Sequence, residues 1–185
     1  EEFDITTCQD MLVDHAASIP LALAWPDRTA PVRIVPIAIN TVQHPLPSAK
    51  RCLAMGRAVA KALAEWEGDE TILVMGTGGL SHQLDGERAG FMNPEYDTFC
   101  MDNLSVDPDA LTKHSVHEMV ALAGTQGVEI LNWIAARGAL GDTAHEVSRS
   151  YHIPISNTAT AVMVLETEAA RAAGKAGAEK TAELA

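Results

Sequence analysis

A short apolar run that ends in a glycine-rich loop constrains the fold of this chain most. Thr71–Met75 is apolar after its first residue, and Gly76-Thr-Gly-Gly79 follows it directly. A short, continuously apolar segment of this kind is typical of a strand that is buried on both faces of an α/β sheet. The glycines allow the backbone to turn tightly at the carboxyl end of the strand, where open α/β sheets place their active sites.

A helix is expected just before this strand. Ser48 is a suitable N-cap residue, and apolar residues recur every three or four positions from there to about Glu67. These residues are Cys52, Met55, Val59, Leu63 and Trp66. Gly68 ends the pattern. The spacing predicts that one face of a helix over 48–67 is buried.

Further strands and helices are predicted on both sides of this pair. Strands are expected at 1–8, 33–39 and 159–165, helices at 108–123, 127–138 and 139–150, a strand or loop entry at 151–157, and irregular backbone at 80–105. A strand, a helix and another apolar strand in succession favour a parallel or mixed sheet. The sequence therefore predicts an α/β fold, a mixed central sheet flanked by helices.

The size and composition are those of one ordinary globular domain. The 185 residues are 47% hydrophobic and 21% charged, which is close to average globular usage and excludes a wholly disordered chain. The longest apolar runs are too short to cross a bilayer, and no signal peptide is visible. A membrane is therefore not an expected partner.

Charge and cysteine content bear on partners and compartment. Lys and Arg number 13 against 25 Asp and Glu, a formal charge of −12. Duplex binding usually needs the opposite balance, so nucleic acid is not an expected partner. Cys8, Cys52 and Cys100 are too widely spaced for a metal-binding pair or a disulfide framework, which favours a reducing, cytoplasmic setting.

His82 is a candidate general base, since it follows the glycine loop and a free imidazole has a pKa near 6.5. A structural, hydrogen-bonded histidine is the alternative. The loop lacks the GxGxxG spacing and the GK[ST] ending of phosphate-binding loops, which argues against nucleotide binding. The GxSxG elbow is also absent, so Ser81-His82 is not expected to form a hydrolase dyad.

Glu129 is the acidic residue with the most unusual sequence context. It lies among apolar residues, and a carboxylate in such surroundings costs free energy unless it is paired or bound to a metal. The alternative is the exposed face of an amphipathic helix. His114 and His117 stand three apart but lack the HExxH pattern, so a solvated helix face is favoured for them. His15 carries no signal by itself.

A long motif resembles a known family. The segment 76–93, GTGGLSHQLDGERAGFMN, resembles the catalytic beta subunits of protocatechuate 4,5-dioxygenases, which are class III (LigB-type) extradiol ring-cleaving dioxygenases. Further stretches agree in order and spacing: Val13-Asp-His15, Pro45-Leu-Pro-Ser-Ala-Lys-Arg-Cys52, Gly127-Val-Glu129, Arg137-Gly-Ala-Leu140 and Tyr151-His-Ile-Pro-Ile-Ser-Asn-Thr158. The resemblance extends from residue 1 to about 166.

The resemblance implies a set of functional residues. Family members hold a non-haem Fe(II) with two His and one Glu, a facial triad that leaves positions open for substrate and oxygen. Glu129 matches the carboxylate ligand and His82 the catalytic base, while His15 matches a second active-site histidine. Ser156, with Asn157 and Thr158 beside it, matches the part that receives the carboxylate of the substrate.

The resemblance also implies an activity: Fe(II)-dependent insertion of O₂ into a carboxylated catechol. A protocatechuate-like substrate with 4,5-cleavage to a hydroxymuconate semialdehyde is expected, with gallate or methylgallate as alternatives. A non-catalytic scaffold is a further alternative, because the two iron-binding His of the family have no counterpart in this sequence. A small alpha subunit, and with it a hetero-oligomer, is the expected partner.

A two-part organisation follows from the same comparison. Residues 1–166 are expected to be the C-terminal portion of a LigB-like catalytic domain, and 167–185 an Ala/Glu/Lys-rich tail that is helical or disordered. The first residue is Glu1 rather than Met, and it opens directly on an alternating pattern. We therefore expect the chain to be cut from a longer one; a processed terminus is the alternative.

Overall fold

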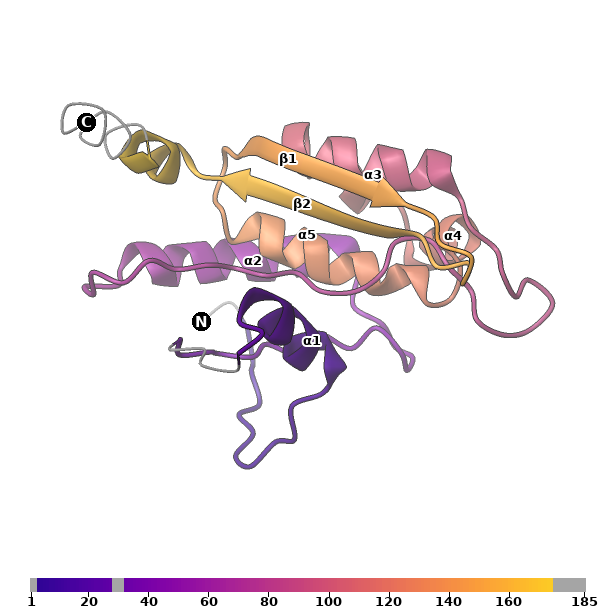
Figure 1. Ribbon diagram of the computed structural model, residues 1–185, viewed down its shortest axis with the longest axis horizontal. Coiled ribbons are helices and arrows are strands. Elements are labelled where there is room, and N and C mark those ends of the chain that lie inside the picture. The colour runs from indigo at the N-terminus through magenta and orange to yellow at the C-terminus, as the bar shows by residue number, and fades with distance from the viewer. Residues whose placement is uncertain (1–2, 28–31, 175–185) are drawn as a thin grey trace.

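Helices and one small sheet make up the structure, a computed structural model that describes residues 3–27 and 32–174 (Figure 1). The elements are α1 (His15–Ala24), α2 (Ala49–Ala64), α3 (Pro94–Val106), α4 (Val116–Ala123), α5 (Ile130–Gly138), β1 (His145–His152) and β2 (Thr160–Glu166), with 3₁₀ turns η1 (Ala110–Lys113) and η2 (Gly127–Glu129). This mixture of helix and sheet confirms the predicted α/β class.

Helix α2 confirms the prediction from Ser48 and shows which face is buried. The Ser48 hydroxyl accepts a hydrogen bond from the amide of Arg51 at 3.2 Å, as an N-cap does. Its buried residues are Ala49, Cys52, Leu53 and Gly56, whereas Trp66 lies beyond the helix and is 57% exposed. A Cβ at Gly56 would lie 2.0 Å from the carbonyl oxygen of Ala135, so glycine is needed where α2 crosses α5.

Helix α3 contradicts the irregular backbone expected over 80–105. Asn93 caps it by accepting from the amide of Tyr96 at 3.1 Å, and Pro94 occupies the first turn. Acidic residues in that turn, Glu95 and Asp97, favour a helix start as well. These signals were in the sequence, and an apolar spacing of three to four residues follows them.

The helix predicted over 108–123 is interrupted, and the one over 127–138 is confirmed. The first divides into η1 and α4, because Ser115 begins a new helix through a capping box. Its hydroxyl accepts from the amide of Glu118, while the Glu118 carboxylate accepts from the amide of Ser115 at 2.7 Å. The second is the 3₁₀ turn η2 followed directly by α5.

An antiparallel hairpin replaces the helix predicted at 139–150. β1 pairs with β2 from His145↔Glu166 to His152↔Thr160, which confirms the predicted strand at 159–165. Alternate β1 side chains reach α3: Arg149 bonds Asp102, and Tyr151 bonds Asp97. This period-2 contact pattern, together with pairing to β2, outweighs the local helix propensity of 145–152.

The strands predicted at 1–8, 33–39 and 71–75 are wrong for the described structure, in which 3–8, 33–39 and 71–75 are irregular; residues 1–2 lie outside the description. Most of their apolar side chains are exposed, for example Ile5 at 79%, Val35 at 86% and Leu73 at 71%. Backbone of this kind becomes a strand only when another strand pairs with it. Within the described residues the sheet is two-stranded and antiparallel, not parallel or mixed.

The core lies between the helices and the hairpin. Buried residues of α2, α3, α4 and α5 form one cluster with Leu80 and Ala159, and Tyr151 and Met163 of the hairpin pack against it. Residues 168–174 are helical, and residues 175–185 of the predicted 167–185 tail lie outside the described residues. Among the described helices, none is long and apolar enough to cross a membrane.

Candidate active site

The glycine loop predicted to lie at an active site contacts Glu129. The amide of Gly79 donates to Glu129 Oε2 at 2.8 Å. Gly78 has a φ of +132°, and a Cβ there would lie 2.7 Å from the Cβ of Glu129, so the close approach requires glycine. Asn132 and Trp133 of α5 donate to the carbonyls of Thr77 and Gly78. The start of α5 therefore fixes the loop and the carboxylate together.

His82 is buried at 6% exposure next to the same loop. Its Nδ1 lies 2.8 Å from the carbonyl oxygen of Leu80. Because a carbonyl only accepts, Nδ1 carries the proton, and Nε2 of the neutral ring is then an acceptor. A Cβ at Gly79 would lie 2.8 Å from Cε1 of the ring. The imidazole and the Glu129 carboxylate thus adjoin the same glycine: the ring lies beside the Cα of Gly79, and the carboxylate accepts from its amide.

Three consecutive amides hold the backbone at His82. Leu80 N donates to the carbonyl of Ala159 at 3.1 Å, and His82 N donates to that of Ala123 at 2.8 Å. Between them, Ser81 N donates to Asp97 Oδ1 at 2.8 Å. The attachments thus come from the residue before β2, the end of α4 and the first turn of α3. Sequence reasoning missed Asp97, because a contact between residues 81 and 97 leaves no local pattern.

The proposed carboxylate-binding residues lie in the turn between β1 and β2. Asn157 has a φ of +56°, and its amide donates to the carbonyl of Pro154 at 3.1 Å. Ser156 and Asn157 are exposed, and Thr158 is half-buried. The next residue, Ala159, bonds Leu80, so the turn directly adjoins the His82 segment. The structure therefore brings this turn, His82 and Glu129 to one region.

His15 is not part of that region. It is the exposed first residue of α1, a helix with no buried residue. No hydrogen bond joins it to His82 or Glu129 within the described residues. In Figure 1, α1 lies on the far side of α2 and α5 from the hairpin. The role implied for His15 stays a prediction, one that this arrangement does not support.

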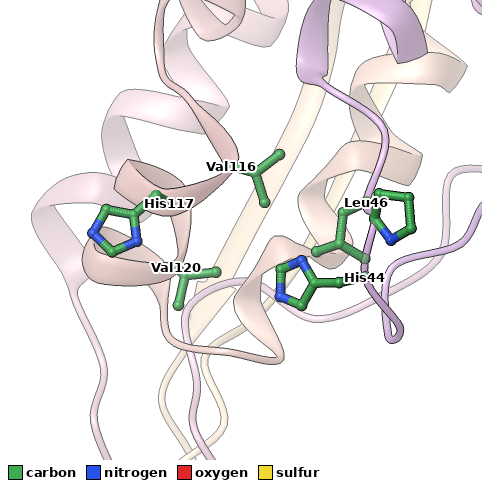
Figure 2. A pocket seen from close by; sticks show the side chains of 6 residues that line it. His44, Leu46, Val116, His117 and Val120 are labelled. Atoms are coloured by element: carbon green, nitrogen blue, oxygen red, sulfur yellow. The ribbon is translucent and has the colours of Figure 1, made fainter.

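Two cavities lie elsewhere. One of about 370 Å³ lies between the loop at 44–46 and α4, where the ring of His44 points toward Val120 and that of His117 points away from His44 (Figure 2). The other, about 550 Å³, is lined by His114 among other residues. His114 packs edge-on against Tyr96 and Phe99, with ring centroids 5.6 Å apart in each pair. The geometry gives His114 an aromatic packing role.

The residues present do not form an iron site by themselves. All seven histidines lie in the described part of the chain, where no three His, Cys, Asp or Glu side chains come together as a metal would need. Glu129 is the candidate ligand, and it already accepts the Gly79 amide with one oxygen. A single carboxylate does not hold Fe(II), which prefers two imidazoles beside it.

Comparisons with known proteins place this chain in a family. Residues 1–163 match the family described as the catalytic LigB subunit of aromatic ring-opening dioxygenase. Gallate dioxygenase of Pseudomonas putida is 37% identical over 167 residues, 90% of this chain and 49% of that protein. A 2,3-dihydroxyphenylpropionate/2,3-dihydroxicinnamic acid 1,2-dioxygenase of Rhodococcus globerulus is 25% identical over 82% of this chain and 62% of its own length.

The extent of these matches decides what they show. The chain spans about half the length of the gallate dioxygenase and less than two thirds of the Rhodococcus enzyme. The family match covers the glycine loop, His82, Glu129 and the hairpin turn alike. The chain therefore belongs to the family of the catalytic LigB subunit of aromatic ring-opening dioxygenases.

Proposed function

We propose that this chain supplies the base-bearing half of the active site of an extradiol ring-cleaving dioxygenase that acts on a carboxylated catechol. The observation that carries the proposal is the pairing of His82 and Glu129 across Gly79. One group is a proton acceptor with a defined tautomer, and the other is a carboxylate fixed beside it. Membership in the LigB family supports this assignment.

His82 acts as the general base of the reaction. The Nδ1 proton is donated to the Leu80 carbonyl, so Nε2 holds the lone pair that takes a phenolic proton from the catechol. Burial of the ring at 6% exposure keeps bulk water away from the transfer. Deprotonation makes the substrate oxygen a better metal ligand and the ring more electron-rich.

The carboxylate of the substrate is received by the turn at 156–158. The Ser156 hydroxyl and the backbone amides of this turn are donors of the kind that carboxylates accept. They are needed locally because the net charge of −12 opposes an anionic substrate. Gallate is the substrate that the comparison with the Pseudomonas enzyme favours, and protocatechuate, which lacks one hydroxyl, is the second candidate.

Iron binding needs residues that this chain does not provide. Glu129 contributes one ligand, and two imidazoles come from a polypeptide region outside this sequence, as the relatives' greater length allows. A small alpha subunit that covers the site is proposed as a further partner. The setting is the cytoplasm, where Fe(II) and free thiols such as Cys52 and Cys100 stay reduced.

Oxygen uptake tests the proposal. In one sample, this chain alone is loaded anaerobically with Fe(II); in the other, it replaces the matching half of the Pseudomonas gallate dioxygenase. We expect gallate to trigger uptake in the chimera and not in the chain alone. A chimera that folds and binds iron, yet leaves both gallate and protocatechuate intact, favours the non-catalytic scaffold instead.

A further inference from the structure

Asp97 is a buried carboxylate that no cation neutralises within the described part of the chain. It is 1% exposed and lies in the first turn of α3. Oδ1 accepts from the amide of Ser81 at 2.8 Å, while Oδ2 accepts from the Ser81 hydroxyl at 2.7 Å and from the Tyr151 hydroxyl at 2.8 Å. Burying a charge is costly without such donors, so three of them at one carboxylate indicate a specific role.

Two of these three bonds converge on Ser81, which is fully buried. Its hydroxyl also accepts from the amide of Asn93 at 2.7 Å, and its carbonyl accepts from the amide of Ala159 at 3.3 Å. Every polar atom of Ser81 is therefore in a hydrogen bond. The backbone dihedral angles of this residue are fixed from three sides.

The conformation of Ser81 decides the state of the His82 ring. Ser81 stands between the Leu80 carbonyl and His82, so its dihedral angles set whether Nδ1 reaches that carbonyl at 2.8 Å. The bond at Leu80 in turn keeps the proton on Nδ1 and leaves Nε2 free. Of the three attachments that anchor the 80–82 amides, those at Ala159 and Ala123 are backbone atoms, and Asp97 provides the side chain.

We propose that Asp97 is the positioning residue of His82: through Ser81 it fixes the ring so that Nδ1 stays protonated and Nε2 faces the site as the acceptor. The structural part of this proposal does not depend on the function of His82. Its consequence for catalysis rests on the proposed function, in which His82 is the base. Tyr151 strengthens the arrangement, because burial and its bond to Asp97 raise the pKa of the phenol and keep it a donor.

Nitrogen-15 NMR of the full 185-residue chain tests this without iron or substrate. At pH 8, His82 is expected to show the Nδ1-protonated tautomer, which free histidine disfavours. Asp97→Asn keeps the shape of the side chain but loses the charge and one acceptor. We expect this variant to give a mixture of tautomers and to exchange the Ser81 and His82 amides at least tenfold faster.

A matched control separates positioning from general destabilisation. Arg137 is also buried, at 2% exposure, and donates to the carbonyls of Leu104, Gly141 and Asp142, away from the loop. Arg137→Gln is expected to leave the His82 tautomer unchanged. The Ser81 and His82 amides of this variant should also exchange no faster, relative to the amides of α5, than in the wild type. Tyr151→Phe, which removes one donor, is expected to fall between the wild type and Asp97→Asn.

Either of two results overturns the proposal. One is an unaltered Nδ1-protonated signal in Asp97→Asn; the other is an equal change in Arg137→Gln. The oxygen-uptake experiment fails separately: a chimera that folds and binds iron but supports no turnover refutes the proposed function, while the tautomer comparison still decides whether Asp97 sets the tautomer of His82.

Discussion

The segment before α2 and the part from α2 to β2 differ in how they use their apolar residues. Every buried residue of the described structure lies at or after Ala49. Before it, many apolar side chains are exposed, such as Leu12 at 93% and Val42 at 83%, while Ile39 and Leu46 are partly buried against the core. Both parts are rich in apolar residues, so composition does not separate them. The difference is that the later part contains the helices that pack against one another.

This contrast teaches what local sequence can specify. A helix forms its backbone hydrogen bonds within its own segment, so a cap and a 3.6-residue pattern were enough to predict α2. A strand needs a neighbour, and 33–39 and 71–75 have no pairing strand among the described residues.

A core truncation should produce the largest difference between the two parts. Leu131 of α5 is fully buried, whereas Leu12 is almost fully exposed. We expect Leu131→Ala to lower the free energy of unfolding by about 3 kcal/mol, because it loses transfer energy and leaves a cavity. Leu12→Ala should change it by about 0.5 kcal/mol or less. Urea unfolding followed by circular dichroism measures both, and equal losses would contradict the comparison.

The crossing of α2 and α5 should be nearly as sensitive. A Cβ at Gly56 would meet the Ala135 carbonyl, so Gly56→Ala must push the helices apart at a cost of about 2 kcal/mol. Gly141, with a φ of +81° and nothing within 4 Å of its Cβ position, is the control for backbone strain alone. Gly141→Ala should cost about 1 kcal/mol. Thermal melts that rank the two in reverse would refute the packing argument.

Removal of a helix cap should have a moderate effect. Ser115→Ala removes the capping box that separates α4 from η1, and we expect a loss of about 1 kcal/mol. Ser18→Ala in α1 is the matched substitution in the exposed segment and should lie within about 0.5 kcal/mol of the wild type. Denaturant midpoints of the two variants provide the measurement, and coinciding midpoints would argue against an independent start for α4.

The smallest effect expected is a pH dependence at the contact between the hairpin and α3. Arg149, and then Ser105, hold the pKa of Glu146 below its usual value. A carboxyl with a lowered folded-state pKa contributes stability above its unfolded pKa and loses it as the pH falls through the folded one. The stability of the wild type should therefore fall below about pH 4, and the stability of Glu146→Gln should fall less steeply. Chemical shifts of the β1 amides, followed during acid titration of both proteins, report the loss of the folded hairpin contact, and parallel curves would contradict this assignment.

The fold was predictable from sequence where signals are local. Ser48 indicated α2, and the apolar run predicted as a strand at 159–165 indicated β2 (Thr160–Glu166). Helix α3 was missed although the N-cap Asn93 and the first-turn Pro94 indicate a helix start, because the surrounding Gly, Asp and Asn residues suggested a loop. β1 was predicted as helix because its strand form depends on β2 and α3, which are remote in sequence.

The candidate site was predictable only in part. The resemblance pointed to His82 and Glu129, and the structure places both beside Gly79, 50 residues from Glu129 in sequence. Asp97 had no such signal, because a buried acid in a helix looks like any polar helical residue until its partner Ser81 is seen. The role implied for His15 would need α1 to pack near His82 and Glu129, and the described α1 has no buried residue.

The measurement that tests the central claim most directly is gallate-dependent oxygen uptake, with iron content, in the chimera that carries this chain. The account predicts that His82→Gln keeps iron and lowers turnover at least about 100-fold, as loss of a general base does. It also predicts that Glu129→Ala loses the iron. Full turnover in His82→Gln, or full iron occupancy in Glu129→Ala, would contradict the claim that these two residues form the reactive half of the site.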